Sequence, residues 1–208
     1  MAGEWIATVG NSDQLKTIIN GPFLKGHREP RVAMVGRSNV GKSSLINSML
    51  GARLAQVSAE PGKTRLIHFY HWKDSSKIIV DLPGYGYARA SQADRNKWAQ
   101  LIQAYLKADE NLQAALLLVD ARNGPSQLDR EAFDFLQSGG VGVQIVFNKT
   151  DGLKTQKERA ERRRDAGSIL EEMGVDPAEA IWVSSRTGDR MNELVNRIRS
   201  FGPGEEGA

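Results

Sequence analysis

The sequence predicts an α/β fold of three layers, in which helices cover both faces of a mostly parallel β-sheet. Short apolar stretches alternate along the chain with longer amphipathic ones, which is the order that produces strand–helix–strand units. The stretch 114–119 is apolar at every position, as expected of a strand that is covered on both faces. We expect an N-terminal extension with a short helix over 1–30, a single domain over 31–201, and a disordered tail over 202–208.

The first expected elements follow from local signals. A helix is expected over 12–20, where Ser12 can accept hydrogen bonds from the N–H groups of the first turn. Two strands, 66–72 and Lys77–Asp81, lie on either side of a polar turn. The later helix 94–107 carries apolar residues at helical spacing, namely Trp98, Leu101, Ile102, Tyr105 and Leu106.

The alternation of apolar and amphipathic stretches defines the other elements. In chain order these are the strand 31–35, the helix Lys42–Leu50, the strand 114–120, the helix 127–136, the strand Val143–Asn148, the helix 154–173, the strand 180–184 and the helix 189–201. In sheets of this kind, ligands bind beyond the C-terminal ends of the strands. Each functional motif should therefore follow a strand.

The composition narrows the classes of protein and of site. The chain has 208 residues, a formal net charge of +3 and no cysteine. The lack of cysteine excludes disulfides, thiol catalysis and cysteine metal sites. No stretch reaches the roughly eighteen apolar residues of a membrane span, and the N-terminus lacks a signal-peptide pattern. We expect a cytoplasmic monomer without a membrane partner, whose slight positive charge permits a nucleic-acid partner.

A complete phosphate-binding loop follows the strand 31–35. It consists of Gly36, Arg37, Ser38, Asn39, Val40, Gly41, Lys42 and Ser43. The glycines allow backbone N–H groups to close around phosphate oxygens, and the helix N-terminus that follows favours an anion. We expect Lys42 to contact the β- and γ-phosphates and the Ser43 hydroxyl to bind Mg²⁺, with Ser44 beside it in the same site. A chance Gly-rich turn is the alternative, and the strand–loop–helix setting makes it improbable.

A second motif follows the strand Lys77–Asp81 and consists of Asp81, Leu82, Pro83 and Gly84. We expect Asp81 to hold Mg²⁺, through a water molecule, and the Gly84 N–H to contact the γ-phosphate. An Asp followed three residues later by Gly occurs about once per chain of this length. The position after a strand is what makes this motif informative.

The loop before the strand 66–72 contains Pro61, Gly62, Lys63 and Thr64. The Thr64 hydroxyl can complete the coordination of Mg²⁺ when a γ-phosphate is present, which would order the loop in one nucleotide state only. Ser58 is the alternative residue. Thr64 is favoured because it lies next to the strand and close to Gly62, which can act as a hinge.

A third motif, Asn148, Lys149, Thr150 and Asp151, follows the strand residues 143–147. The Asp151 carboxylate can accept hydrogen bonds from both N1–H and the 2-amino group of guanine. Adenine offers neither donor, so it would leave Asp151 unpaired and be rejected. The Lys149 stem can lie along the base, and Asn148 can tie this loop to the phosphate-binding loop. A strand-ending turn with a solvated charge pair is the alternative.

The end of the strand 180–184 and the turn after it contribute Val183, Ser184, Ser185 and Arg186. We expect a backbone N–H in this turn, at Ser185, to donate to the guanine O6 atom. A turn that caps the last helix explains the segment almost as well.

Together these motifs predict a P-loop GTPase with a Ras-like G domain, which binds GTP or GDP with Mg²⁺ and hydrolyses GTP. Lys42, Thr64 and Gly84 are the residues expected to act in catalysis. Ras-type enzymes orient the attacking water with a Gln directly after the second motif, whereas this chain has Tyr85 there. We therefore expect slow hydrolysis, as in a switch that waits for a partner, and a packing or partner-contact role for Tyr85.

Asn39 admits two interpretations of equal weight. In related GTPases an Asn at this position helps to hold K⁺ near the phosphates, and such a cation could supply positive charge during hydrolysis. The other interpretation is a loop Asn that hydrogen-bonds to local backbone.

The histidines and a charged stretch carry weaker predictions. His27, His68 and His71 have no spacing typical of metal ligands, so surface or strand positions explain them. The stretch 154–165 mixes both signs of charge, and a solvated helix face is favoured there over an edge that contacts RNA.

With these motifs, the chain resembles the EngB (YihA or YsxC) family of bacterial ribosome-biogenesis GTPases, within the TrmE-Era-EngA-EngB group of Ras-like P-loop GTPases. The segments that carry the resemblance are 36–47, 61–64, 81–88 and 116–125, of which 82–87 is the most specific to the family. The resemblance implies a role in assembly of the large ribosomal subunit, by contact with that subunit or its rRNA. It also implies a requirement in normal cell division and septation.

Three other functions are weaker predictions. A G domain that regulates membrane transport would carry a membrane region. A small-molecule kinase or ATPase conflicts with Asp151, since the carboxylate disfavours adenine. A protein that only binds nucleotide and does not hydrolyse it is disfavoured, because Lys42, Ser43 and Asp81, the residues expected to contact the phosphates and Mg²⁺, are all present.

Overall fold

The computed structural model describes residues 3–19, 21, 24, 27–56, 66–86 and 91–202. The strands within this part are β1 (Gly3–Val9), β2 (Arg31–Gly36), β3 (Ile67–Trp72), β4 (Lys77–Asp81), β5 (Leu112–Asp120), β6 (Val143–Asn148) and β7 (Ile181–Trp182). The longer helices are α1 (Ser12–Ile19), α3 (Lys42–Leu50), α4 (Gln92–Ala108), α5 (Gln127–Ser138), α6 (Gln156–Glu172) and α7 (Met191–Arg199).

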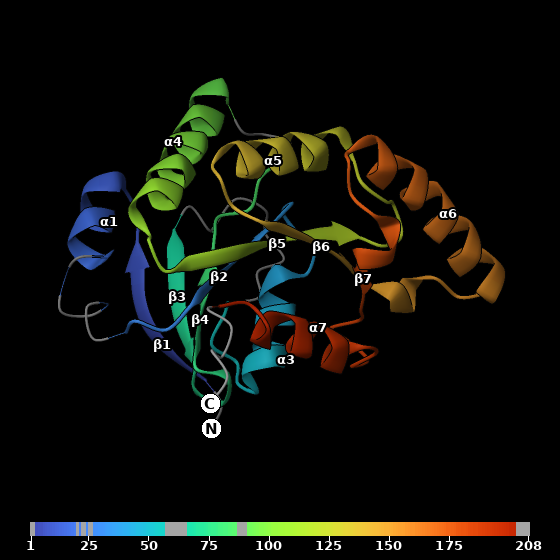
Figure 1. The fold of residues 1–208 in the computed structure, drawn as a ribbon, viewed down its shortest axis with the longest axis horizontal. Helices are drawn as coiled ribbons and strands as arrows, with labels where there is room; N and C mark the ends of the chain where they lie inside the picture. Colours follow the sequence, from blue (N-terminus) through green and yellow to red (C-terminus); the bar gives the residue numbers. More distant parts are fainter. Residues whose placement is uncertain are drawn as a thin grey trace.

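The strands form one sheet in the order β1-β3-β4-β2-β5-β6-β7 (Figure 1). β4, β2, β5, β6 and β7 run parallel, whereas β1 and β3 pair antiparallel at one edge. The predicted α/β fold with a mostly parallel sheet is therefore confirmed. No helix in the described ranges is both long enough and apolar enough to cross a membrane.

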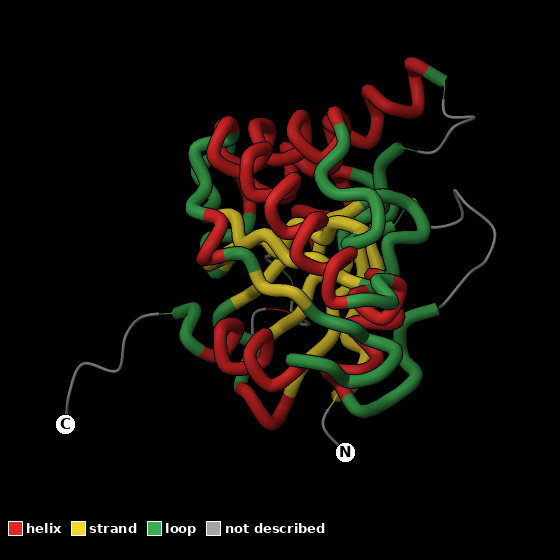
Figure 2. Tube along the Cα trace, turned by 90° about the vertical axis from the view of Figure 1, so that its right-hand side faces the viewer, coloured by secondary structure: helices red, strands yellow, loops and turns green. Residues whose placement is uncertain are grey.

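The sheet separates two hydrophobic cores. Helices α1, α4, α5 and α6 cover one face and helices α3 and α7 cover the other, which gives the predicted three layers (Figures 1 and 2). Along β2, Ala33 and Val35 belong to the first core and Val32 and Met34 to the second. This division follows because successive side chains of a strand point to opposite faces. The two-sided burial explains the continuous apolar runs in the central strands.

The N-terminal segment contributes a strand that the sequence did not predict. β1 pairs antiparallel with β3, with Gly3 opposite Trp72 and Val9 opposite Ile67. The segment 1–30 therefore adds both a strand and a helix to the domain. β1 is an edge strand whose Trp5 side chain is exposed, and such a strand owes its structure mainly to pairing with its neighbour.

Asn11, and not Ser12, caps helix α1. The Asn11 Oδ1 atom accepts hydrogen bonds from the N–H groups of Asp13 at 3.1 Å and Gln14 at 2.9 Å. Both residues can cap a helix, and the structure selects the one that lies a residue earlier. The predicted N-cap was therefore wrong by one position.

Other element ends differ by a few residues from the predictions. Helix α4 begins earlier, at Gln92, because Ser91 caps it. Helix α6 begins later, at Gln156, because Thr155 is its N-cap, so Lys154 precedes the helix. β7 is shorter than the predicted strand over 180–184.

Some predictions concern residues outside the described part of the chain. These are the tail 203–208, the residues Tyr87 and Ala88 after the second motif, and the loop residues Ser58, Pro61, Gly62, Lys63 and Thr64.

A buried ion pair fixes the first residue of β2. Arg31 Nη1 donates to Asp109 Oδ1 at 2.7 Å, and both side chains are almost completely buried. The Arg31 N–H also donates to the Asn111 carbonyl oxygen at 2.8 Å. Asp109 directly follows α4, so these contacts tie β2 to the connection between α4 and β5. Removing one charge would leave the other unpaired in the protein interior, which is strongly unfavourable.

We predict that Arg31→Met lowers the free energy of unfolding by about 3–5 kcal/mol, because it leaves the Asp109 carboxylate buried and unpaired. The matched control is Arg130→Met, which removes the exposed pair of Arg130 with Glu172 and should cost at most about 1 kcal/mol. Urea unfolding followed by tryptophan fluorescence measures both. Equal, small losses in the two variants would show that the buried pair has no special role.

Candidate functional site

A cleft of about 1030 Å³ opens at the C-terminal ends of the parallel strands. Its walls come from α3 and its preceding loop, from the segment after α3, and from the loops after β5, β6 and β7. The lining residues are Gly41, Ser44, Asn47, Arg53, Ala55, Arg122, Lys149, Asp151, Gly152, Lys154, Ser185 and Arg186. The phosphate-binding loop and the predicted base-binding loops therefore face one cavity, which has the size expected of a small-ligand site.

The loop between β2 and α3 has the backbone geometry of an anion cradle. Asn39 and Gly41 both adopt left-handed conformations, with φ of 65° and 96°. A Cβ atom on Gly41 would lie 2.5 Å from Asn148 Nδ2, so only glycine fits there. Gly41 is also the N-cap of α3 and provides no side-chain hydrogen bond to it. The N-cap thus provides no side-chain acceptor for the first N–H groups of α3, as is typical of a helix N-terminus that receives phosphate.

Lys42 and Asp81 form a buried ion pair. Lys42 Nζ donates to Asp81 Oδ1, and the residues are 9% and 3% exposed. Lys42 comes from the first turn of α3 and Asp81 from the last residue of β4, which is next to β2 in the sheet. The predicted phosphate-binding lysine and the predicted Mg²⁺ carboxylate are therefore in direct contact. Ser43, the other predicted Mg²⁺ residue, follows Lys42 on α3 and is partly buried.

The second motif packs against the phosphate-binding loop. The Tyr85 N–H donates to the Gly36 carbonyl at 3.3 Å, and the Ser38 N–H donates to the Tyr85 carbonyl at 2.9 Å. A Cβ atom on Gly84 would approach the Gly36 oxygen and the Ser38 nitrogen at 3.3 Å. Gly84 therefore lies against the loop, where a larger residue would be crowded, and the contact of its N–H with a γ-phosphate stays a prediction.

Tyr85 is a packing residue in this structure. Its hydroxyl donates to Asp129 Oδ1 at 2.7 Å, and its ring meets Trp98 edge to face. Burial, and after it the nearby Asp129 carboxylate, raises the pKa of the Tyr85 hydroxyl well above its usual value. The Trp98 Nε1–H in turn donates to the Pro83 carbonyl at 2.6 Å. The hydroxyl is thus already engaged with α5 and is not directed at the cleft.

Asn148 joins three loops of the site. Its side chain is completely buried; Nδ2 donates to the Val40 carbonyl at 3.1 Å, and Oδ1 accepts from the Ser185 N–H at 3.1 Å. The predicted tie between this loop and the phosphate-binding loop is confirmed. The Ser185 N–H, which was expected to donate to the guanine O6, is bonded to Asn148 in this structure.

Lys149 is held by a carboxylate that sequence reasoning did not select. Lys149 Nζ donates to Asp120 Oδ2 at 3.0 Å and to the Asn39 carbonyl. Burial alone would raise the pKa of Asp120, but hydrogen bonds from Arg122 and Lys149 lower it to about 2. Asp120 ends β5 directly opposite Asn148 in the sheet register. A polar residue at the end of a buried strand is the sequence signal that could have indicated Asp120 as a site residue.

Asp151 is oriented by the turn after β7. The Ser184 hydroxyl donates to Asp151 Oδ1 at 2.7 Å, and Arg186 Nη1 lies 3.7 Å from Oδ2. Thr150 is buried, and its N–H donates to the Val183 carbonyl at 3.2 Å. The carboxylate is therefore fixed at the cleft, while Thr150 and Ser184 support it.

Two predicted ligand-binding residues have buried side chains. Leu82 and Val183 are completely buried in the two cores. Their side chains shape the loops that carry the site, and contact of these residues with a ligand stays a prediction. The described structure thus brings together all the predicted motifs except 61–64, which lies outside it.

Comparison with known proteins consistently finds GTP-binding proteins. The family described as "50S ribosome-binding GTPase" matches residues 31–149. A probable GTP-binding protein EngB from Desulfovibrio desulfuricans is 44% identical over 84% of this chain and 85% of its own length. The corresponding protein of Streptococcus pneumoniae is 38% identical over 90% and 95%. A crystal structure of a probable GTP-binding protein EngB superimposes with a TM-score of 0.63 at 26% identity, covering 81% of this chain and 96% of the other.

We predict that Tyr85→Phe lowers the free energy of unfolding by about 1.5–3 kcal/mol, the usual cost of losing a hydrogen bond to a charged group. Nucleotide hydrolysis should stay within about twofold of the unmodified rate, because the hydroxyl faces Asp129 and not the cleft. Urea unfolding and single-turnover hydrolysis measure the two effects. A tenfold loss of hydrolysis with unchanged stability would instead make the Tyr85 hydroxyl part of the chemistry.

Proposed function

This chain belongs to the EngB family of ribosome-binding GTPases, and from that premise we propose that it is a GTP-hydrolysing switch in assembly of the large ribosomal subunit. We further propose that it works in the cytoplasm as a monomer and is needed for normal cell division and septation. GTP hydrolysis follows from family membership. The ribosomal role rests on the family description and on the resemblance of the motifs.

One observation carries the proposal for the nucleotide. A single cleft joins an anion cradle, Gly41 and the N-terminus of α3, to a fixed carboxylate, Asp151. Asn148 connects the two ends through bonds to the Val40 carbonyl and the Ser185 N–H. A nucleotide with its phosphates at one end and its base at the other matches this arrangement.

Guanine recognition is assigned to Asp151 with support from two neighbours. The Asp151 carboxylate accepts from N1–H and the 2-amino group, and the Ser184 hydroxyl holds it in position. The Lys149 stem lies along the base, because its ammonium is anchored by Asp120 and the Asn39 carbonyl. Since Asn148 occupies the Ser185 N–H, the next N–H of the turn, that of Arg186, is the proposed donor to the guanine O6.

The phosphates and Mg²⁺ are assigned to the Lys42–Asp81 pair and its neighbours. Both charges of the pair are buried, so each needs a partner of opposite charge when the two separate. Lys42 would contact the β- and γ-phosphates, and Ser43, Thr64 and Asp81 would hold Mg²⁺, Asp81 through a water molecule. Mg²⁺ held there would neutralise charge on the phosphates during hydrolysis. The Gly84 N–H contacts the γ-phosphate.

Slow hydrolysis by the isolated protein follows from the position of Tyr85. Ras-type GTPases orient the attacking water there with a glutamine amide, whereas the Tyr85 hydroxyl is bonded to Asp129. We propose that contact with the large ribosomal subunit or its rRNA organises the catalytic site so that the attacking water is oriented.

A second proposed activator is K⁺, held near the phosphates with the help of Asn39. The Asn39 side chain is exposed beside the cradle, and no hydrogen bond from it occurs within the described residues. That observation disfavours the alternative of a loop Asn bonded to local backbone. The cation would add positive charge where an arginine finger acts in other GTPases.

We predict that Asp151→Asn weakens GDP binding by about 10²–10⁴-fold and gives binding of xanthosine diphosphate, because an amide can donate to the xanthine 2-oxo group. Competition with a fluorescent nucleotide measures both affinities. The matched control is Asp165→Asn on the exposed face of α6, which should change neither. Unchanged GDP affinity in Asp151→Asn would refute the assigned base contact.

We predict that purified large ribosomal subunits accelerate GTP turnover by about tenfold or more in Mg²⁺ buffer, as expected when a partner organises the catalytic site. Small subunits at equal concentration are the control. If neither subunit accelerates turnover, the protein is still a GTPase, but the proposed ribosomal trigger is refuted.

In the same assay, replacing KCl with NaCl should slow GTP turnover, and equal rates in the two salts would refute the K⁺ site.

A further inference from the structure

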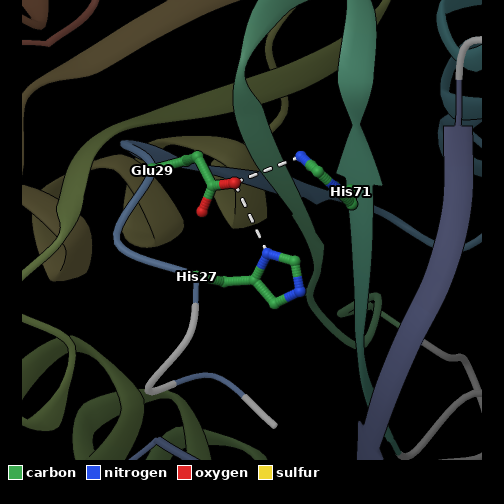
Figure 3. A group of neighbouring side chains, drawn as sticks. All are labelled: His27, Glu29 and His71. Carbon is green, nitrogen blue, oxygen red and sulfur yellow. Dashed lines mark hydrogen bonds and ion pairs between the residues drawn. The ribbon is translucent and has the colours of Figure 1, made fainter.

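Three side chains that are not close to the nucleotide cleft converge on one point. His27 and Glu29 belong to the loop that precedes β2, and His71 belongs to β3. Figure 3 shows a ring nitrogen of each histidine directed at the same Glu29 carboxylate oxygen. Their candidate ligand atoms all lie within 4.8 Å of one another. The sequence spacing gave no sign of this, because His71 lies far along the chain from the other two.

Local structure holds the two loop residues in place. Glu29 precedes Pro30, which disfavours a helical backbone at Glu29, and the chain bends at this residue. The Pro30 carbonyl accepts from the Ile78 N–H at 3.1 Å, and the His27 carbonyl accepts from Arg31 Nη2 at 3.2 Å. The loop is therefore fixed to β4 and to the buried Arg31 side chain before any ligand binds.

The distances exceed those of strong hydrogen bonds. His27 Nδ1 lies 3.4 Å and His71 Nε2 lies 3.2 Å from Glu29 Oε1. Charge-assisted N–H···O bonds usually measure about 2.7–2.9 Å. Ligands about 2.0–2.1 Å from a tetrahedral ion are instead about 3.3–3.4 Å from one another. The two N···O distances thus match edges of a tetrahedral metal site, and the two histidine nitrogens lie within 4.8 Å of each other.

Glu29 adds a second, independent sign. Its Oε2 atom is buried and has no hydrogen-bond partner within the described structure. A carboxylate oxygen that is buried without a hydrogen-bond partner is unfavourable unless a donor or a cation meets it.

We propose that His27, Glu29 and His71 bind one divalent transition-metal ion, with Zn²⁺ as the best match. Two imidazoles and one carboxylate form a ligand set that zinc uses in proteins. The fourth position goes to water or to Glu4, which lies opposite His71 in the β1–β3 register. Glu4 also pairs with Lys73, so its recruitment would require that pair to open.

The ion would act as a structural clip. It would connect the loop before β2 to β3, next to edge strand β1, at the end of the sheet away from the phosphate-binding loop. His71 faces Ile78 across the β3–β4 pair, whereas His68 faces Asp81 of the nucleotide site. Zinc should therefore raise the stability of the fold without altering guanine selectivity.

The test uses the full chain loaded with Mg²⁺ and GDP, so that the nucleotide site is occupied. Zinc chloride is titrated by isothermal calorimetry, and the thermal midpoint is measured with and without zinc. We expect one zinc ion per chain, a higher midpoint, and visible absorption typical of tetrahedral coordination when Co²⁺ replaces Zn²⁺. His27→Gln, Glu29→Gln and His71→Gln should each weaken zinc binding at least tenfold.

The matched control is His68→Gln, a histidine on the same strand whose ring bonds Thr8; it should retain zinc binding. GDP binding verifies that each variant is folded. His27→Gln remains decisive if His71→Gln unfolds, because His27 lies in a loop. No zinc binding by the unmodified chain, or equal affinity in His27→Gln and His68→Gln, would overturn the proposal.

Discussion

Parallel pairing of the central strands is the constraint on which the rest of the structure depends. Because β4, β2, β5 and β6 point the same way, their last residues meet at one edge of the sheet. Gly36, Asp81, Asp120 and Asn148 end these four strands. Hydrophobic burial on both faces fixes the register of each strand. A slip by one residue would move every side chain of that strand into the core on the opposite face. The site is thus a consequence of how the sheet is packed.

Polar contacts then convert this edge into a defined site. Asn148 links the phosphate-binding loop to the turn after β7, and Asp120 holds Lys149 against the Asn39 carbonyl. Ser184 fixes Asp151. These contacts exist within the protein alone, so the proposed base-binding end is formed before a nucleotide binds. Little of the binding free energy is therefore spent on ordering it. At the phosphate end, the proposed binding of phosphate and Mg²⁺ would open the Lys42–Asp81 pair, which would make this part responsive to the bound nucleotide.

The sequence predicts features that depend on local pattern and fails where distant segments meet. The three layers, the strands and the tie from Asn148 to the phosphate-binding loop follow from apolar runs and motifs. β1 was missed because an edge strand depends on its neighbour. The roles of Asp120 and of the Ser185 N–H, and the cluster around Glu29, arise from residues that are distant in sequence, so no spacing rule reveals them.

We propose that this edge of the sheet is a guanine-nucleotide site built around Asp151. The most direct measurement is the equilibrium dissociation constant of GDP and of ADP for the purified protein in Mg²⁺ buffer. We predict that GDP binds at least about 100-fold more tightly than ADP, because adenine would leave the Asp151 carboxylate facing an acceptor. Equal affinities, or a preference for ADP, would contradict it.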